Sequence, residues 1–299
     1  MGKQQDVVTV LGRANVDLVI HVRRLPSAGR AAFGSPLTTT AGGKALNQAV
    51  TVARLGGVAR LVANVGGDVW GHLLAGALSE AGVDTAGFRL IANATTGAAI
   101  IAVTPDGESY VCMALSPETE LTPADVAQVL AGPAPSAMVT QLDLAPDVVH
   151  SVLQAPRPRL LVGNLEPHPE IDRQLLGELD LYIVNEEEAA AVLGAEHVEA
   201  AEAVAELQKL GPRAVVVTAG ARGAFYSRGT GIGAVVADAV EVVDTTGAGD
   251  AFLGALVLSM TRGSDLEEAV AVAVRAGGLA AQHSGALLPP LSPTQRFVR

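Results

Sequence analysis

The chain has very little sulfur and few aromatic rings. Its 299 residues include a single cysteine, Cys112, which excludes an internal disulfide framework and is compatible with a reducing compartment. Because the neighbours of Cys112 are apolar, we expect it to be a buried strand residue rather than a nucleophile. Aromatic residues make up only 3% of a chain that is 49% hydrophobic, so its core has to be mostly aliphatic.

Long apolar runs and metal-binding histidines are also missing. No apolar run approaches the ~18 residues that a membrane span needs, and no basic region followed by a long apolar stretch occurs near the N-terminus. The sequence therefore predicts a soluble, cytoplasmic protein without a membrane partner. Its six histidines show no ligand spacing, which argues against a metal site made of histidine.

Positive charge is scarce. The formal net charge is -11 and the isoelectric point is near 5.0, which argues against nucleic acid as a partner. Only three of the 20 basic residues are lysines, so a lysine in a glycine-rich segment, Lys44, is notable. An anionic ligand such as ATP would have to be held by helix amides, a divalent metal and a few cations rather than by the overall field.

Short apolar runs alternate with helical segments along most of the chain. The runs predict buried parallel strands at 7–11, 60–65, 137–142, 160–163, 181–184 and 214–218. Helices are predicted at 43–55, 69–81, 122–131, 145–154, 186–193, 198–210, 250–262 and 265–282. This alternation is typical of an α/β fold with three layers, α/β/α, and a mostly parallel central sheet.

Two segments interrupt the alternation, 18–40 and 88–115. The second carries a hairpin signal at Asp106-Gly107, and we expect the two segments to pair as a small β-sheet. The prediction is therefore a main α/β domain of residues 1–17, 41–87 and 116–299, with a smaller β part made of 18–40 and 88–115.

The segment from Asp244 to Asp250 reads as a strand end that breaks into a helix. Gly247 and Gly249 allow a tight turn and keep side chains away, so the amides around Ala248 can point together at a phosphoryl group. Asp250, in the first helical turn, can then accept a proton from an attacking hydroxyl. An ordinary strand-to-helix connection with Asp250 as its N-cap is the alternative.

A second glycine-rich segment, Gly42 to Ala49, leads into the next helix. It combines amides, a cation and an amide side chain, which suit hydroxyl groups and the charge that develops during phosphoryl transfer. It is not a P-loop, because Lys44 is followed by Ala45 rather than by serine or threonine. Residues 247–249 are not a dinucleotide fingerprint either, because Phe252 occupies the third glycine position.

Together, the two segments resemble the signatures of the ribokinase (PfkB carbohydrate kinase) family. Further matches follow in the family's order at Gly12, Asn15, Asp17, Gly66-Gly67-Asp68, Gly71, Asn185, Glu188, Thr218, Gly220 and Gly223. The resemblance spans nearly the whole chain. It implies a ribokinase-like fold in which 18–40 and 88–115 form a lid over the sugar site, and such a lid commonly doubles as the surface of a homodimer.

The resemblance also implies roles for single residues. Asp250 would be the catalytic base, and the amides of Gly247, Ala248 and Gly249 would hold the transferring phosphoryl group. The sugar would be bound by Asn15, Asp17, Gly42, Gly43, Lys44, Asn47, Asp143 and Asp250. Two departures leave the identity of the sugar open: Asp143 stands where ribokinases usually place a glutamate, and Leu46 adds bulk near the sugar.

Nucleotide binding is implied for a third set of positions, with Mg²⁺ near Glu188. These positions are Asn185, Glu188, Thr218, Gly220, Gly223, Gly249 and Arg275. From the residues alone, Asn185 can instead simply cap a helix whose dipole is complemented by three glutamates at 186–188.

A potassium ion beside the anion hole is a further implication of the resemblance. Its ligands would be the Asp244 side chain and mostly main-chain groups of Thr246, Ala280, His283 and Gly285. Pro289 falls where ribokinases commonly supply a serine hydroxyl, so we expect weakened potassium activation.

The resulting expectation is an ATP-dependent kinase that phosphorylates a primary hydroxyl of a small sugar, with ribose as the first choice. Fructose, deoxyribose and a nucleoside are alternatives within the family, and the scarcity of aromatic residues weighs against the nucleoside. A non-catalytic sugar or nucleotide sensor is the alternative from another class, and the intact Asp250 speaks against it.

Overall fold

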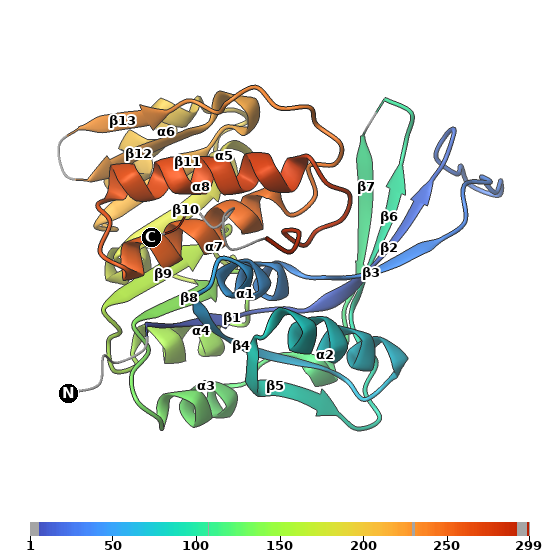
Figure 1. The fold of residues 1–299 in the computed structure, drawn as a ribbon, viewed down its shortest axis with the longest axis horizontal. Helices are drawn as coiled ribbons and strands as arrows, with labels where there is room; N and C mark the ends of the chain where they lie inside the picture. The colour runs from blue at the N-terminus through green and yellow to red at the C-terminus, as the bar shows by residue number, and fades with distance from the viewer. Residues whose placement is uncertain (1–5, 107, 229–230, 292–297, 299) are drawn as a thin grey trace.

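A large twisted sheet forms the centre of the molecule in the computed structural model, which describes residues 6–106, 108–228, 231–291 and 298 (Figure 1). Its strands are β1 (Val7–Leu11), β4 (Val58–Gly66), β5 (Asp84–Ile91), β8 (Ala137–Gln141), β9 (Leu160–Asn164), β10 (Leu181–Asn185), β11 (Ala214–Thr218), β12 (Ala224–Arg228) and β13 (Ile232–Val235). Their order is β13-β12-β11-β10-β9-β8-β1-β4-β5. Neighbours from β11 to β5 pair in parallel, whereas β12 and β13 add an antiparallel edge.

Helices cover both faces of this sheet (Figure 1). They are α1 (Lys44–Arg54), α2 (Val69–Ala81), α3 (Pro123–Leu130), α4 (Pro146–Leu153), α5 (Glu186–Leu193), α6 (Ala200–Gln208), α7 (Ala248–Thr261) and α8 (Leu266–Ala281). Every predicted helix is present. No helix in the described ranges has the length and apolar character needed to cross a membrane.

Two apolar layers explain why the strands read as continuous hydrophobic runs. In β10, Leu181 and Ile183 join the cluster that contains residues of α1, α7 and α8. The alternate residues Tyr182 and Val184 join the cluster that contains α4, α5 and α6. Because side chains alternate along a strand, a strand buried on both faces needs apolar residues at every position. The predicted three-layer fold is confirmed.

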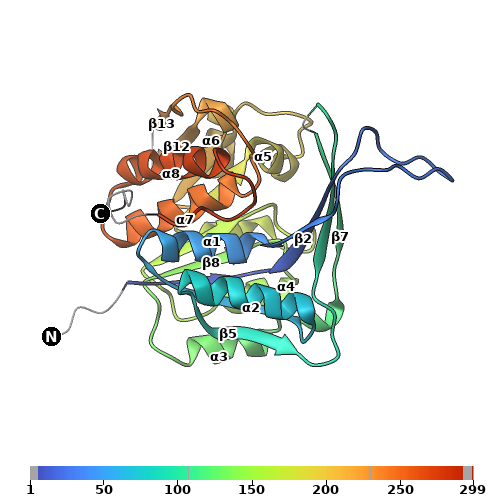
Figure 2. The same ribbon diagram turned by 45° about the vertical axis from the view of Figure 1, so that its right-hand side comes forward.

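A separate sheet of four strands stands at one end of the molecule, and we call it the small sheet (Figure 2). It consists of β2 (Asn15–His21), β3 (Thr38–Gly42), β6 (Ala98–Val103) and β7 (Ser109–Ala114) in the order β3-β2-β6-β7. The predicted hairpin is present, since β6 and β7 pair antiparallel. Its expected turn residue Gly107 lies outside the described residues.

Two expectations need correction. Residues 88–91 belong to β5 of the large sheet, where Phe88 pairs with Ala63, so the β segment expected at 88–115 begins too early. As an edge strand with several exposed positions, β5 lacks the continuous apolar run that marked the inner strands. Cys112 lies in a strand as expected but is exposed, because all six residues of β7, an edge strand, are exposed.

Candidate active site

A cavity of about 240 Å³ opens where β9, β10 and β11 end and where α1 and α7 begin. In open α/β sheets, ligands bind at the carboxyl ends of the strands, where helix N-termini also point. The cavity is lined by seven residues that the sequence predicted for the site: Lys44, Asn185, Glu188, Thr218, Gly247, Gly249 and Asp250.

The first turn of α7 has the geometry of an anion-binding helix terminus. Gly247 is the N-cap in the left-handed region, with φ of 76°, and a Cβ there would clash with the Ala286 carbonyl. Gly249 lines the cavity, and a Cβ there would meet nothing within 4 Å, so the space beside its Cα is open. The carboxylate of Asp244 fixes the preceding turn by accepting from the amides of Thr246 and Gly285, both at 2.9 Å.

Asp250 is buried at the start of α7, and both of its oxygens are held by amide side chains of α1. Asn47 donates to Oδ2 at 2.9 Å and Gln48 donates to Oδ1 at 3.0 Å. Burial raises the pKa of Asp250, whereas Lys44 and the two amides act to lower it. Sequence reasoning assigned no role to Gln48, although it adjoins Asn47, nor to Asn164, which accepts from Gln48 at 3.2 Å.

Lys44 and Glu188 face each other across the cavity, with 3.5 Å between Nζ and Oε1. The other oxygen of Glu188 accepts from the amide of Asn185 at 3.0 Å, and the Asn185 side chain accepts from the amide of Glu188 at 2.8 Å. This reciprocal capping box is the alternative that the sequence left open for Asn185. It also orients the Glu188 carboxylate, because one oxygen is fixed at the helix end while the other lies near Lys44.

Asn15 and Asp17 lie at the start of β2 and are buried. Asn15 donates to Asp17 at 2.8 Å. Burial raises the pKa of Asp17 to about 6, opposed by the hydrogen bond from Asn15 and reinforced by the charge of Asp250. Close approach requires the neighbouring glycines, since a Cβ on Gly42 would clash with the Asp17 carboxylate and one on Gly43 with the backbone of the loop after β1.

Asp143 follows β8 and is held by an arginine that sequence reasoning passed over. The Arg13 guanidinium donates to Asp143 Oδ2 at 2.7 Å and lies 3.2 Å from each oxygen of Glu120. Burial raises the pKa of Asp143, and the charges of Arg13 and Lys44 act to lower it. The only signal that could have indicated Arg13 was its place directly after Gly12 and two residues before Asn15.

The remaining residues predicted for the nucleotide lie around or away from the cavity. Thr218 lines it at the end of β11. Gly220 and Gly223 belong to the short turn after β11, where a Cβ on Gly223 would clash with the Val235 carbonyl. Arg275 is exposed on α8 and is not among the residues that line the cavity.

The residues predicted for a monovalent cation gather where the turn before α7 meets the chain after α8. Asp244 binds the amide of Gly285 there, and the Ala280 carbonyl accepts from the amide of His283 at 3.0 Å. The His283 ring lies 2.9 Å from the Leu279 carbonyl, so the imidazole is engaged with α8. Hydrogen bonds from Gly285 and Thr246 hold the pKa of Asp244 below its usual range despite its partial burial.

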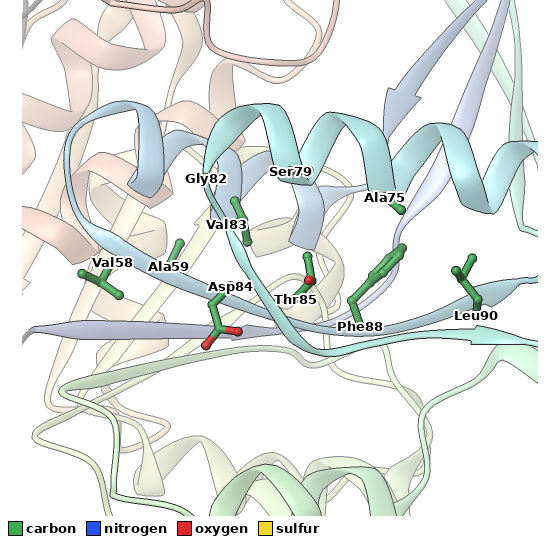
Figure 3. A pocket seen from close by; sticks show the side chains of 10 residues that line it. All are labelled: Val58, Ala59, Ala75, Ser79, Gly82, Val83, Asp84, Thr85, Phe88 and Leu90. Carbon is green, nitrogen blue, oxygen red and sulfur yellow. The ribbon is translucent and has the colours of Figure 1, made fainter.

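A second hollow lies between α2 and β5 (Figure 3), and it shares no lining residue with the cavity at Asp250. It is lined mainly by apolar or small side chains such as Ala75, Val83 and Phe88. Its carboxylate, Asp84, is bound to Arg60 at 2.7 Å. Since its lining residues include no helix N-terminus with a buried carboxylate like Asp250, we do not assign it to catalysis.

A helix N-terminus at a cavity, with a buried carboxylate in its first turn, is the arrangement expected of a phosphotransferase that acts on an alcohol. Residues 5–294 match the pfkB family carbohydrate kinases, so the chain belongs to this family. It is therefore an ATP-dependent sugar kinase.

Individual relatives agree with this assignment. The chain is 30% identical to a ribokinase from Haemophilus influenzae, over 97% of this chain and 98% of the relative. It is also 30% identical to fructokinase-1 from Oryza sativa, over 99% and 97% of the two chains. The structure of Arabidopsis thaliana ribokinase complexed with ribose and ATP superposes with a TM-score of 0.81 at 28% identity, covering 95% of each chain.

Proposed function

We propose that this kinase transfers the γ-phosphoryl group of ATP to a primary hydroxyl of a small neutral sugar, with ribose as the first substrate to test. The carrying observation is that buried Asp250 lies in the first turn of α7 and lines one cavity together with Gly247 and Gly249. Asp250 takes the proton of the sugar hydroxyl while the hydroxyl oxygen forms a bond to the γ-phosphorus. The bond between that phosphorus and the bridging oxygen breaks, and ADP leaves.

The polar groups that line the cavity at Asp250 and those around Asp17 and Asp143 suit the two substrates in different ways. The α7 amides and Lys44 would face the phosphates, since both carry positive charge or dipole. Asp17 and Asp143 would accept hydrogen bonds from sugar hydroxyls. Several carboxylates in one pocket disfavour an anionic sugar, which supports a neutral one.

Mg²⁺ fits the phosphate side of this proposal. The described residues contain no cluster of three or more potential metal ligands. However, Mg²⁺ on a nucleotide commonly uses one or two carboxylates together with phosphate oxygens and water, and the oriented Glu188 can serve in this way. When bound, the ion would neutralise charge on the transferring group. Potassium could sit near Asp244 and stabilise the turn before α7.

Ribose is favoured over a nucleoside because no aromatic residue lines the hollow around Arg13 and Asn15, and bases favour stacking partners. The ribokinase relatives support the same choice, whereas the fructokinase keeps a ketohexose open. An ATP-consumption assay with ribose, deoxyribose, fructose, a nucleoside and a sugar acid tests this. Preference for ribose supports the proposal, and preference for the sugar acid contradicts a neutral substrate. Turnover with no member of the panel would favour a sensor.

We further propose a homodimer formed through the small sheet. Its edge strand β7 exposes Tyr110, Val111 and Met113, each about half exposed, and Ile100 lies on the neighbouring strand. Adjacent exposed apolar side chains on an unpaired sheet edge favour association with a second copy of the chain.

A further inference from the structure

Arg13 lies between two carboxylates at the edge of the proposed sugar pocket. Its Nη1 donates to Asp143 Oδ2 at 2.7 Å, and its Nη2 lies 3.3 Å from the Asp143 carbonyl. Its Nε and Nη2 each lie 3.2 Å from an oxygen of Glu120. The guanidinium thus binds both the side chain and the backbone of Asp143, and its fork geometry leaves little freedom to either carboxylate.

The backbone places this arginine beside the sugar residues. The amide of Arg13 donates to the Gln141 side chain at 2.9 Å, which ties the loop after β1 to the end of β8. A Cβ on Gly43 would clash with the Arg13 carbonyl and with Ala14, so the same loop packs directly on the start of α1. Arg13 is therefore held both at its backbone amide and at its guanidinium.

Asp143 retains one unused acceptor. Its Oδ1 is buried and has no hydrogen-bond partner among the described residues, whereas Oδ2 is bound to Arg13. Lys44, which lines the cavity at Asp250, lies close enough to affect the ionisation of Asp143. A buried oxygen without a donor is unfavourable in the free protein, and a hydroxyl of a bound sugar would satisfy it.

We propose that Arg13 is a positioning residue for sugar binding, which holds the short Asp143 carboxylate so that its free Oδ1 accepts a sugar hydroxyl. This inference rests on the sugar site proposed above. The aspartate side chain is short, and the position of its carboxylate depends on the partner that fixes it. A longer carboxylate at position 143 would have to share its space with the guanidinium, because Nη1 already lies 2.7 Å from Oδ2.

The same arrangement affects which sugars fit. Because Arg13 is already paired with Asp143 and Glu120, it offers no free positive charge to a carboxylate or phosphate on the substrate. The part of the pocket near Arg13 therefore presents hydrogen-bond acceptors to hydroxyl groups, as expected for a neutral sugar.

The test is steady-state kinetics of Arg13→Ser with ribose, or with the best sugar of the panel. We expect the sugar KM to rise roughly 10-fold or more, with kcat at saturating sugar and the ATP KM within about 2-fold of wild type. Arg157→Ser is the matched control, since Arg157 also lies between two carboxylates, Glu178 and Asp180, each at 3.3 Å. We expect its sugar KM to stay unchanged.

Replacement of the pair separates positioning from a general effect on folding. Asp143→Glu added to Arg13→Ser should recover much of the lost sugar affinity, because the longer carboxylate then has both reach and space. Asp143→Glu alone should weaken sugar binding, because the guanidinium occupies that space. Arg13→Lys keeps the charge but lacks the fork, and should lie between wild type and Arg13→Ser.

An unchanged sugar KM in a folded Arg13→Ser protein, or equal losses for the sugar and ATP, would overturn the inference. If Arg13→Ser does not fold, the milder Arg13→Lys carries the same test, and a sugar KM equal to wild type overturns it. A wild-type enzyme that phosphorylates no sugar at all would instead contradict the proposed function, so the two failures are distinguishable.

Discussion

At the start of α7, the groups that would face the phosphates are backbone amides fixed by Gly247 and Asp244, and we call this the phosphoryl end. Around Asp17 and Asp143 the polar groups are side chains from separate segments, and we call this the sugar end. Backbone geometry is a local property, whereas the sugar end depends on which side chains the fold brings together. We therefore expect the phosphoryl end to control turnover and the sugar end to control affinity and choice of sugar.

The largest effect should come from the base of the phosphoryl end. Asp250→Asn keeps the helix amides but removes the proton acceptor, so kcat should fall by about 10²-fold or more while the ATP KM changes little. Single-turnover measurements with radiolabelled ATP give the rate of the chemical step. Turnover within tenfold of wild type would show that Asp250 is not the base.

At the sugar end, Asp17→Ala should raise the sugar KM by about 10- to 100-fold through loss of a charged acceptor. The ATP KM should change far less, because Asp17 is not among the residues that line the cavity at Asp250. Steady-state kinetics with each substrate varied in turn measure both values. Equal changes in the two KM values would mean that Asp17 acts through folding, and the division into two ends would fail.

Asp17 should also couple the sugar end to pH. Burial raises its pKa to about 6 from an ordinary value of 3.8, so the folded state holds the proton to higher pH than the unfolded chain. Well below pH 4 both states hold the proton and this group does not affect the stability of the fold; the stability falls as the pH rises from about 4 to about 6. The sugar KM should rise as the pH falls below 6, because the protonated form is a poorer acceptor.

The stability side of this coupling has its own test. Asp17→Asn should increase the free energy of unfolding at pH 7.5 by up to about 3 kcal/mol, and by much less at pH 4.5. Urea denaturation at the two pH values measures this difference. Asp84→Asn is the control, and it should instead decrease the free energy of unfolding at pH 7.5. Hydrogen bonds from Ala86 and Arg60 hold the pKa of Asp84 below its usual range despite partial burial. A loss of stability in Asp17→Asn at pH 7.5 contradicts the expectation.

A dimer formed through the small sheet would place the subunit interface on the sheet that carries Asp17. Val111→Asp should shift the protein from dimer to monomer in light scattering and raise the sugar KM by a few-fold, with kcat retained. Ile232→Asp, on an exposed residue of β13 at an edge of the large sheet, should leave the dimer intact. A wild-type monomer at all concentrations would refute the dimer.

The smallest expected effect concerns potassium at the phosphoryl end. In buffer free of sodium and potassium, adding potassium should raise kcat by about 2- to 5-fold through better preorganisation of the amides. The effect is modest because Pro289 supplies no hydroxyl ligand. A rate that stays constant as potassium is added would remove the cation from this site.

Sequence alone determined the layered fold and the phosphoryl end, because both depend on local patterns. Continuous apolar runs require strands buried on both faces, and Gly247 and Gly249 allow the turn that opens α7. The identity of Asp250 as the carboxylate beside these amides follows from the same few positions.

Only the tertiary structure decided the rest. The exposure of Cys112 and the membership of residues 88–91 in β5 depend on which strands lie at the edges of the two sheets. The contact of Gln48 with Asp250 and the clamp of Arg13 on Asp143 join residues far apart in the sequence. A local sequence pattern cannot predict such contacts, because packing brings the partners together. Packing also shifts their pKa values through burial.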